Sequence, residues 1–474
     1  MMKAGLLILA AATVLGAQGA LEVKNVKLSQ DWPWSNKVKL TYDLSGLAEG
    51  ELAEVVVTAT SGGKPIEMYA PGLTGDIYSL DANDSYTISI DPVKAFGKGI
   101  ELVPDVRMSV TARAATSDST NVLYKIFDIK NRSVTDVTRG ALLNGEWGSV
   151  ETDFGAIGPG YKTTLEDVVI WTGVTNDVAY KTSKLVVRKI PAGAFKGYKP
   201  GAAIPAENNM IWSFDYWIGV FEVTDGQRLA LYNAAPGTYK LQVGSSLYKP
   251  KSLVPGETLP AQHISNYFLY GHKANRNGTT NVTDNTAGFM NYMRRRFTFD
   301  GVAEYDFELP TQVQWVRAMR AGADSYYYDG IGKTSSEVTV EQFNALACNP
   351  NNGGYVKHED GSITTNIVSV GSFRPNAYGL YDTLGNIQEL TREDQDLLSD
   401  QQWTDGGEDI IGTITLLSGG TTRSSSLVGG AFDESSLAFA TRHVHGTSST
   451  IGTGFRVCMQ SMEDGIALIT PKTE

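Results

Sequence analysis

Apolar and polar positions alternate along much of the first 130 residues. Apolar side chains occupy every second position in five short runs separated by Gly, Asn and Asp: Val38 to Leu44, Val55 to Val57, Tyr86 to Ile90, Val106 to Val110 and Val122 to Ile126. A period of two is typical of strands with one buried face, and the intervening residues favour tight turns. The pattern predicts an antiparallel, Ig-like β-sandwich over residues 20–130.

The pattern changes after residue 130. Residues 131–185 are rich in Thr, Gly and Asp and are typical of a connector, in which Trp147 and Trp171 indicate packing on a neighbouring element. Further on, Thr224–Gln227 and Thr311–Gln314 each place Gln three residues after Thr, the spacing of a capping box at a helix start. We therefore expect two helices within residues 186–462, followed by a tail at 463–474.

The first 19 residues have the pattern of a signal peptide. Lys3 precedes an apolar run from Leu6 to Leu15, and Ala17 and Gly19 are small residues at the positions a signal peptidase requires before Ala20. The run is too short to span a bilayer, so a transmembrane anchor is the weaker alternative. We expect an exported protein that is secreted, periplasmic or at the cell surface, without a membrane span in the mature chain.

Composition narrows the class of partner. The chain has 474 residues, 50 glycines and a net charge of −12. Length and composition suit a globular protein of two or three domains. The negative charge argues against nucleic acid or an anionic membrane as the main partner.

Few residues are suited to soft-metal or thiol chemistry. The two cysteines, Cys348 and Cys458, could pair or remain free thiols, and the sequence leaves both possibilities open. His443 and His445 would share one face of a strand, as a metal-binding pair does, but no third ligand is evident.

A glycine-rich turn near residue 385 carries acids on both sides. Asp382 and Glu389 are seven residues apart, with Gly385 and Asn386 between them. Two carboxylates around a tight turn suit a hard cation that backbone carbonyls also coordinate. An ordinary turn with solvated acids has the same pattern, so the spacing alone leaves both readings open.

This turn lies in a stretch, Pro375 to Leu390 (PNAYGLYDTLGNIQEL), that resembles the core signature of the formylglycine-generating enzyme family, or sulfatase-modifying factor domain. Other stretches resemble further motifs of that family in the same order: Val187–Gly197, Phe214–Gln227, Leu309–Gly322, Gly429–Gly430 and Gly454–Arg456. Several ordered motifs are far more specific than any one of them. The resemblance implies an α+β fold of the C-type-lectin-like kind over residues 186–462.

The resemblance also implies structural calcium. By motif position the ligands would be the side chains of Asp382 and Glu389 and the carbonyls of Gly385 and Ile387. A second calcium would lie in a polar loop expected over residues 340–367. The match there is too loose to choose among the oxygen-bearing candidates Asn349, Asn351, Asn352, Glu359 and Asp360.

The catalytic features of the family are missing from the matching positions. Its active members carry two copper-binding cysteines, five residues apart, after the double glycine; Glu434 and Phe439 stand there in this chain. Gln388, Leu390 and Val428 also depart from the motif. Copper is therefore not expected, and we assign neither catalytic nor cofactor-binding residues.

These observations favour a non-catalytic binding or structural protein on a sulfatase-modifying-factor scaffold. It would recognise a protein or glycan at the cell surface through polar loops at 396–426 and 443–453. The alternative is an active oxidoreductase that converts a sulfatase cysteine to formylglycine. A carboxylate-based site at Asp433 and Glu434 is a further enzymatic possibility. The sequence does not indicate the oligomeric state.

Overall fold

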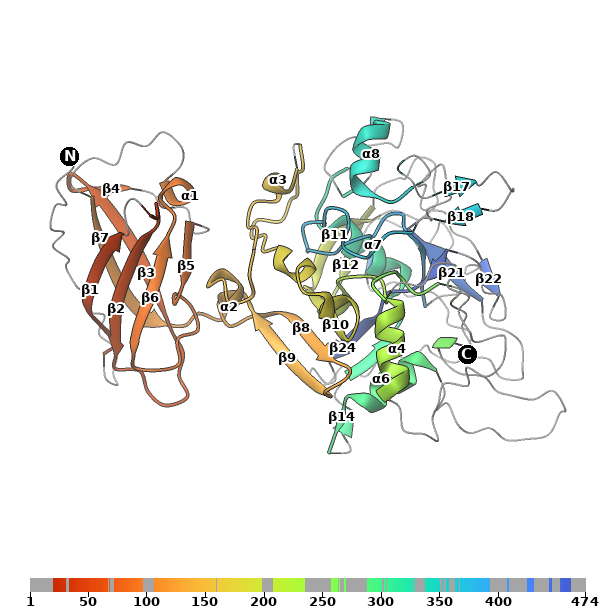
Figure 1. Cartoon of the computed structure of the whole chain (residues 1–474), viewed down its shortest axis with the longest axis horizontal. Helices are drawn as coiled ribbons and strands as arrows, with labels where there is room; N and C mark the ends of the chain where they lie inside the picture. Colours follow the sequence, from red (N-terminus) through yellow and green to blue (C-terminus); the bar gives the residue numbers. More distant parts are fainter. Residues whose placement is uncertain are drawn as a thin grey trace. The chain divides into compact units, whose positions relative to one another are not determined.

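A computed structural model of the chain shows two compact units (Figure 1). The first comprises residues 1–123, 136–152 and 171–174, and the second 124–135, 153–170 and 175–474. The structure describes residues 20–30, 34–66, 68, 72–96, 106–158, 160–197, 208–234, 257–262, 264, 268–269, 288–300, 302–303, 305–325, 327–328, 337–349, 352, 355–357, 363–365, 367–392, 407–408, 424–429, 443–445 and 452–461.

The first unit contains two antiparallel sheets that share one hydrophobic core. The sheets have the strand orders β1-β2-β6-β5 and β4-β3-β7. Their bounds are β1 Glu22–Gln30, β2 Val38–Ser45, β3 Ala53–Ser61, β4 Lys64–Ile66, β5 Leu73–Gly75, β6 Ser85–Ile90 and β7 Val106–Ala114, with helix α1 at Pro92–Phe96. Leu40, Ile88, Val55 and Val110 from both sheets meet in this core, so the predicted sandwich is confirmed.

The fifth predicted sandwich strand belongs to the other unit. β8 (Val122–Asp128) pairs with β10 (Lys184–Ile190), with Ile126 opposite Val186. Leu123, Tyr124, Ile126 and Phe127 are all buried, so the strand is covered on both faces. The sequence-based assignment of this strand to the sandwich was wrong, because alternation reports burial without showing which sheet supplies it.

Part of the predicted connector packs within the first unit. Helix α2 (Arg139–Leu143) begins at Thr138, whose hydroxyl accepts a hydrogen bond from Ala141 N. Trp171 donates its Nε1–H to Trp147 O at 2.7 Å, and the two rings meet edge to face at 5.7 Å. The two tryptophans therefore pack on each other within the predicted connector, whereas the sequence predicted packing on a neighbouring element.

The second unit is built on a six-stranded sheet with order β16-β24-β13-β10-β8-β9. Its further strands are β9 Ser133–Thr138, β13 Tyr216–Gly219, β16 Tyr305–Glu308 and β24 Cys458–Ser461. A three-stranded sheet contains β11 Gly193–Gly197, β12 Asn208–Trp212 and β20 Gly407–Glu408. A four-stranded sheet contains β19 Gln388–Leu390, β21 Ser424–Val428, β22 His443–His445 and β23 Thr453–Gly454. Two further pairs are β14 Thr298–Phe299 with β15 Val302–Ala303, and β17 Tyr355–Lys357 with β18 Ile363–Thr365.

Short helices accompany these sheets, and several begin at a capping box. The described helices are α3 Phe154–Ile157, α4 Asp225–Ala234, α6 Phe289–Arg296, α7 Gln312–Arg320 and α8 Val340–Leu346, with 3₁₀ turns η2 Thr172–Thr175 and η3 Val178–Lys181. The boxes predicted before α4 and α7 are present. Helix α8 begins with the same Thr339–Gln342 pattern, so the loop predicted from residue 340 begins as a helix. Among the described helices, none is long and apolar enough to cross a membrane.

A buried carboxylate connects two strands of the sandwich. Glu54 on β3 accepts hydrogen bonds from Arg113 Nε at 2.7 Å and from Thr116 N and Oγ1 at 3.2 Å. Burial alone raises the pKa of Glu54, but hydrogen bonds from Ser119, Thr116 and Arg113 hold that pKa below its ordinary value. The ionised form is therefore the one that stabilises the fold.

We expect Glu54→Gln to lower the stability of the sandwich by about 1–3 kcal/mol, because charge-assisted hydrogen bonds are lost. Hydrogen exchange at neutral pH should show weaker protection in β3 and β7 and unchanged protection in α7. Because the folded-state pKa of Glu54 is lowered, the wild-type advantage is present at neutral pH and disappears as the pH falls below about 4. Glu22→Gln removes a surface ion pair with Lys24, in which the Glu22 side chain is 42% exposed, and should change stability by less than about 0.5 kcal/mol. An equal loss in both variants would contradict the assignment.

Candidate functional site

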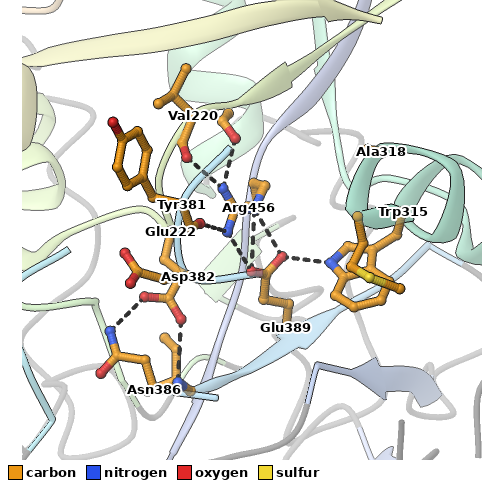
Figure 2. A network of polar contacts seen from close by, with 12 residues as sticks. Val220, Glu222, Trp315, Ala318, Tyr381, Asp382, Asn386, Glu389 and Arg456 are labelled. Atoms are coloured by element: carbon orange, nitrogen blue, oxygen red, sulfur yellow. Dashed lines mark hydrogen bonds and ion pairs between the residues drawn. The ribbon is translucent and has the colours of Figure 1, made fainter. Parts of the chain in front are cut away.

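A buried ion pair between Arg456 and Glu389 lies at the centre of the second unit (Figure 2). Arg456 Nη2 donates to Glu389 Oε1 at 2.8 Å, and Nε lies 3.2 Å from both carboxylate oxygens. Trp315 Nε1 donates to Glu389 Oε2 at 2.9 Å. The two charged side chains are 0% and 1% exposed, so the pair is shielded from solvent.

The remaining guanidinium hydrogens bind backbone carbonyls. Nη1 donates to Gly219 O and Val220 O at 2.8 Å, and Nη2 donates to Tyr381 O at 2.7 Å. With the bonds to Glu389, every N–H of Arg456 has an acceptor. Burial by itself lowers the pKa of Arg456, but Glu389 outweighs that effect and raises it. The guanidinium is therefore a fixed positive charge in the core.

Each member of this group sits at a defined position of the fold. Trp315 is on α7, where the Thr311 capping box fixes the start of the helix. Glu389 is the middle residue of β19, which pairs with both β21 and β23. Arg456 lies between β23 and β24. The ion pair thus links the small four-stranded sheet to the six-stranded sheet.

A pair of acidic residues, Glu222 and Asp382, lies beside the Arg456–Glu389 ion pair. Glu222, three residues beyond the end of β13, accepts hydrogen bonds from Ile387 N at 3.2 Å and from Asn386 Nδ2 at 2.8 Å. Asp382 Oδ2 accepts from Gly371 N at 2.5 Å, whereas the buried Oδ1 has no hydrogen-bond partner. Figure 2 shows the carboxylates of Glu222 and Asp382 beside one another, and the two groups interact electrostatically.

Burial disfavours the charged forms of this second pair. It raises the pKa of Glu222 well above its ordinary value, and the Asp382 carboxylate adds to the effect. Burial likewise raises the pKa of Asp382 to about 6, while the hydrogen bond from Gly371 and the charges of Arg456 and Lys181 oppose it. Burial and mutual repulsion thus favour the neutral, protonated form in this pair of carboxyl groups.

The turn from Asp382 to Asn386 requires residues with left-handed backbone conformation. Asp382, Gly385 and Asn386 have φ values of 52°, 71° and 59°. A Cβ on Gly385 would lie 2.4 Å from Cys348 O, so glycine is needed for space as well as for conformation. The predicted tight turn is present, and it brings Asn386 against Glu222.

The two carboxylates among the four expected calcium ligands, Asp382 and Glu389, lie in different environments. Asp382 has an unpartnered buried oxygen, which suits a cation ligand. Glu389 directs both oxygens to Arg456 and Trp315. Gly385 N donates to Gly429 O, and Ile387 N donates to Glu222. Calcium binding itself stays a prediction.

The candidates for a second calcium site are only partly described. Asn349 Nδ2 donates to Asn344 Oδ1 and Ala347 O, and Asn352 Oδ1 accepts from Asn349 N at 2.9 Å. These amides stabilise the turn after α8. Asn351, Glu359 and Asp360 lie outside the described residues.

The two cysteines are not joined in a disulfide, and they belong to different hydrophobic clusters. Cys348 packs with Ile367 and Ile387, and burial raises its pKa to about 12. Cys458, on β24, packs in the main core, and burial raises its pKa as well. Neither thiol is in an environment that favours the reactive thiolate.

Most of the remaining positions singled out in the sequence lie outside the described residues. Glu434, Phe439 and Asp433 lie outside the described residues, as do most of the two polar loops. His443 and His445 lie on β22, opposite Ser426 and Ser424 of β21. Among the described residues, no group of three or more His, Cys, Asp or Glu side chains could hold a metal ion.

The sequence analysis missed the roles of Glu222 and Arg456. Both lie inside matched motifs, where Glu222 is an acid within an otherwise apolar run and Arg456 ends the Gly-Phe-Arg triplet. A charged residue in an apolar run signals a buried partner, because an unpaired buried charge is costly. That signal predicts a partner but does not name it.

Most of the second unit matches a known protein family. Residues 176–461 match the family described as the sulfatase-modifying factor enzyme 1-like domain. No curated protein matches the chain.

Among solved structures, a Treponema denticola variable protein 1 matches with a TM-score of 0.37 and 18% identity, over 58% of this chain and 95% of that one. PvdO from Pseudomonas aeruginosa matches with a TM-score of 0.40 and 15% identity, over 58% and 94%. CarF matches with a TM-score of 0.34 and 18% identity, over 57% and 97%.

We expect Arg456→Lys to lower the free energy of unfolding of the second unit by about 3–5 kcal/mol. A lysine keeps the charge but cannot reach Glu389 and three carbonyls in one geometry, so buried acceptors lose their donors. Urea denaturation followed by hydrogen exchange in β19 and β24 measures the effect. The exposed Arg107→Lys is the matched control, and a similar small change in both variants would refute the role assigned to the guanidinium.

Gly385→Ala should be destabilising by about 2–5 kcal/mol, the sum of left-handed strain and overlap with Cys348 O. Gly63→Ala is a control with similar φ, +78°, and no atom within 4 Å of the added Cβ. It should cost only about 1–2 kcal/mol. Thermal unfolding of the two variants gives the comparison, and equal losses would show that the close approach at Gly385 is unimportant.

Proposed function

Because the chain belongs to the sulfatase-modifying factor enzyme 1-like family, we propose that it is an exported, non-catalytic member that binds a protein or glycan at a cell surface. Export rests on the signal-peptide pattern of residues 1–19, which lie outside the described part of the chain. The binding role rests on the state of the two thiols and on the polarity of the loops.

The observation that carries the proposal is the separation and burial of Cys348 and Cys458. The oxidase chemistry of the family uses a pair of copper-bound thiolates, and copper(I) prefers such soft ligands. In this chain the two cysteines are not paired with each other, and each packs in a different apolar cluster. Their raised pKa values oppose formation of thiolates near neutral pH.

The sequence positions of the family thiols support the same proposal. Glu434 and Phe439 align with them, and neither side chain can supply sulfur. Cys458 cannot take that place without leaving β24, where it pairs with Ile218 and Glu308. Retention of the scaffold without its paired thiols is consistent with a role in recognition.

In this proposal the recognition surface is formed by two polar stretches of the sequence. Residues 396–426 and 443–453 are rich in Ser, Thr and Gly, and their described parts include strands β20 and β22 and the first residues of β21. Polar loops on a rigid base are a common arrangement for binding sites. Negative net charge favours partners other than nucleic acids or anionic membranes.

We expect the purified protein, loaded with copper(I) in air, to leave a peptide with the sulfatase Cys-x-Pro-x-Arg motif unchanged. Mass spectrometry detects conversion of the thiol to an aldehyde, and a known active enzyme serves as the positive control. Conversion of the peptide would overturn the non-catalytic proposal and favour the oxidoreductase alternative. Loss of that conversion in Cys348→Ser or Cys458→Ser would then identify the thiol.

The binding half of the proposal needs a separate measurement. A glycan array and a panel of extracellular proteins should yield a ligand whose binding weakens when Ser448, Ser449 and Thr450 are replaced by alanine. Replacement of Ser117, in the first unit, is the control. A ligand that binds the loop variant as well as wild type would exclude this loop as the recognition surface.

A further inference from the structure

We propose that Arg132 and Arg296 together bind a tetrahedral oxyanion of the sulfate or phosphate class. Arg132 lies in the turn between β8 and β9, and Arg296 is the last residue of helix α6. A free ion and an ester group on a glycan present the same chemistry, and the test has an arm for each source. Neither arginine belongs to the two polar loops, so the site is independent of whether those loops bind a ligand.

Each arginine of the pair binds the backbone of the segment that carries the other. Arg132 donates from Nε to Arg296 O at 3.0 Å and from Nη2 to Thr298 O. Arg296 donates from Nε to Ile129 O at 2.9 Å and from Nη2 to Lys130 O at 2.8 Å. All four acceptors are uncharged carbonyls. The exchange brings both guanidiniums to the place where the β8–β9 turn meets the end of α6 (Figure 1).

The contacts of the pair leave its positive charge without a carboxylate. Among the described residues, no Asp or Glu forms an ion pair with Arg132 or Arg296. Asp128 interacts electrostatically with Arg296. That carboxylate is already engaged, because it accepts hydrogen bonds from Asn131 N and Nδ2 and lies 4.0 Å from Lys184 Nζ. The carbonyl dipoles at the end of α6 offset only part of the charge.

Neighbouring residues add to the positive charge. Lys130 and Arg295 are exposed and close to the pair in sequence, whereas Asp300 is an exposed acid in the β14–β15 turn. Partial burial lowers the pKa of Arg296, and the charge of Arg132 lowers it further. A dianion bound to both guanidiniums would remove the repulsion between them.

Donors for an oxyanion remain on both side chains. A guanidinium has five N–H groups, and each arginine uses only Nε and Nη2 in its contacts with described residues. Arg132 is exposed and Arg296 is partly exposed, so a ligand can reach the remaining donors. The centre of the Phe299 ring lies 5.4 Å from Arg132 Cζ. This ring and the backbone contacts orient the guanidinium in advance, which lowers the entropy cost of binding.

The donor set indicates the kind of ligand. Two guanidiniums carry two positive charges and two forked sets of donors. Sulfate and phosphate match both features, because they carry up to two negative charges and have several acceptor oxygens. A single carboxylate would satisfy one fork and leave the other charge uncompensated.

The test uses the full-length protein at constant ionic strength, titrated in a calorimeter with sodium sulfate or sodium phosphate in a sodium chloride buffer. Both ions should bind the wild type saturably. Arg132→Gln and Arg296→Gln should each weaken this binding at least about tenfold, because charge-assisted hydrogen bonds are lost. Arg132→Lys keeps the charge without the fork and should weaken binding less than Arg132→Gln does.

Arg107→Gln is the matched control. Arg107 is an exposed arginine on β7 of the first unit, so this variant loses the same charge from the other unit. It should bind both ions as the wild type does. An equal loss in Arg107→Gln and Arg132→Gln would show that net charge alone attracts the ions. Unchanged affinity in Arg132→Gln and Arg296→Gln would likewise overturn the proposal.

A second arm identifies the source of the oxyanion with immobilised chondroitin sulfate and its desulfated form. Retention of the wild type on the sulfated polymer alone, with loss of retention in Arg132→Gln, would assign an ester group on a glycan. Binding of the free ions without retention on the polymer would assign a free ion. Absence of both kinds of binding in the wild type would exclude the site.

A wild-type crystal soaked in sodium selenate locates the ion without any substitution, which keeps the test decisive if Arg296→Gln does not fold. Anomalous scattering from selenium should place the ion within hydrogen-bond distance of both guanidiniums. Selenate that contacts only one of the two arginines, or that binds only elsewhere, would refute the paired site.

Discussion

The second unit depends on one guanidinium in a dry core. Arg456 binds Glu389 and three backbone carbonyls, and these acceptors come from two segments far apart in the sequence: residues 219–220, and the stretch that contains Tyr381 and Glu389. A buried charge with every hydrogen bond satisfied resists displacement, because moving any segment leaves an unpaired group in a medium of low dielectric. Arg456 therefore connects the end of β13 in the six-stranded sheet to β19 in the four-stranded sheet, and Glu389 extends the connection to Trp315 of helix α7.

That constraint also determines which acids are chemically available. Arg456 and Trp315 occupy both oxygens of Glu389, whereas Asp382 keeps a buried oxygen without a hydrogen-bond partner and has Glu222 beside it. Both lie in motifs of the family, yet spacing along the chain gives no hint that one acid is saturated and the other is not. The distinction arises from the donors that tertiary structure brings to each carboxylate.

Sequence reasoning predicted local features better than long-range pairing. Period-two runs identified the sandwich, Thr-x-x-Gln identified helix starts, and the family motifs identified the second unit. The assignment of β8 failed because alternation is a property of a strand and not of its neighbour. The Asp382 turn was found from its glycine, while Glu222 was missed because its partners are more than 160 residues away. The fold does not test whether the protein binds calcium, whether it is exported, or which ligand the polar loops bind.

The path of the chain between the two units affects how the family domain can be isolated. The chain enters the second unit at Tyr124, returns to the first at Asp136 and again at Trp171, and stays in the second from Thr175. The family match begins at residue 176, so it leaves out β8, which lies between β10 and β9 in the six-stranded sheet. A fragment cut at that boundary would expose the unpaired edge of β10, a buried strand rich in Val, Leu and Ile, and invite edge-to-edge aggregation. A fragment meant to fold alone should therefore include β8, a strand that comes before the family match and shortly after the last strand of the sandwich.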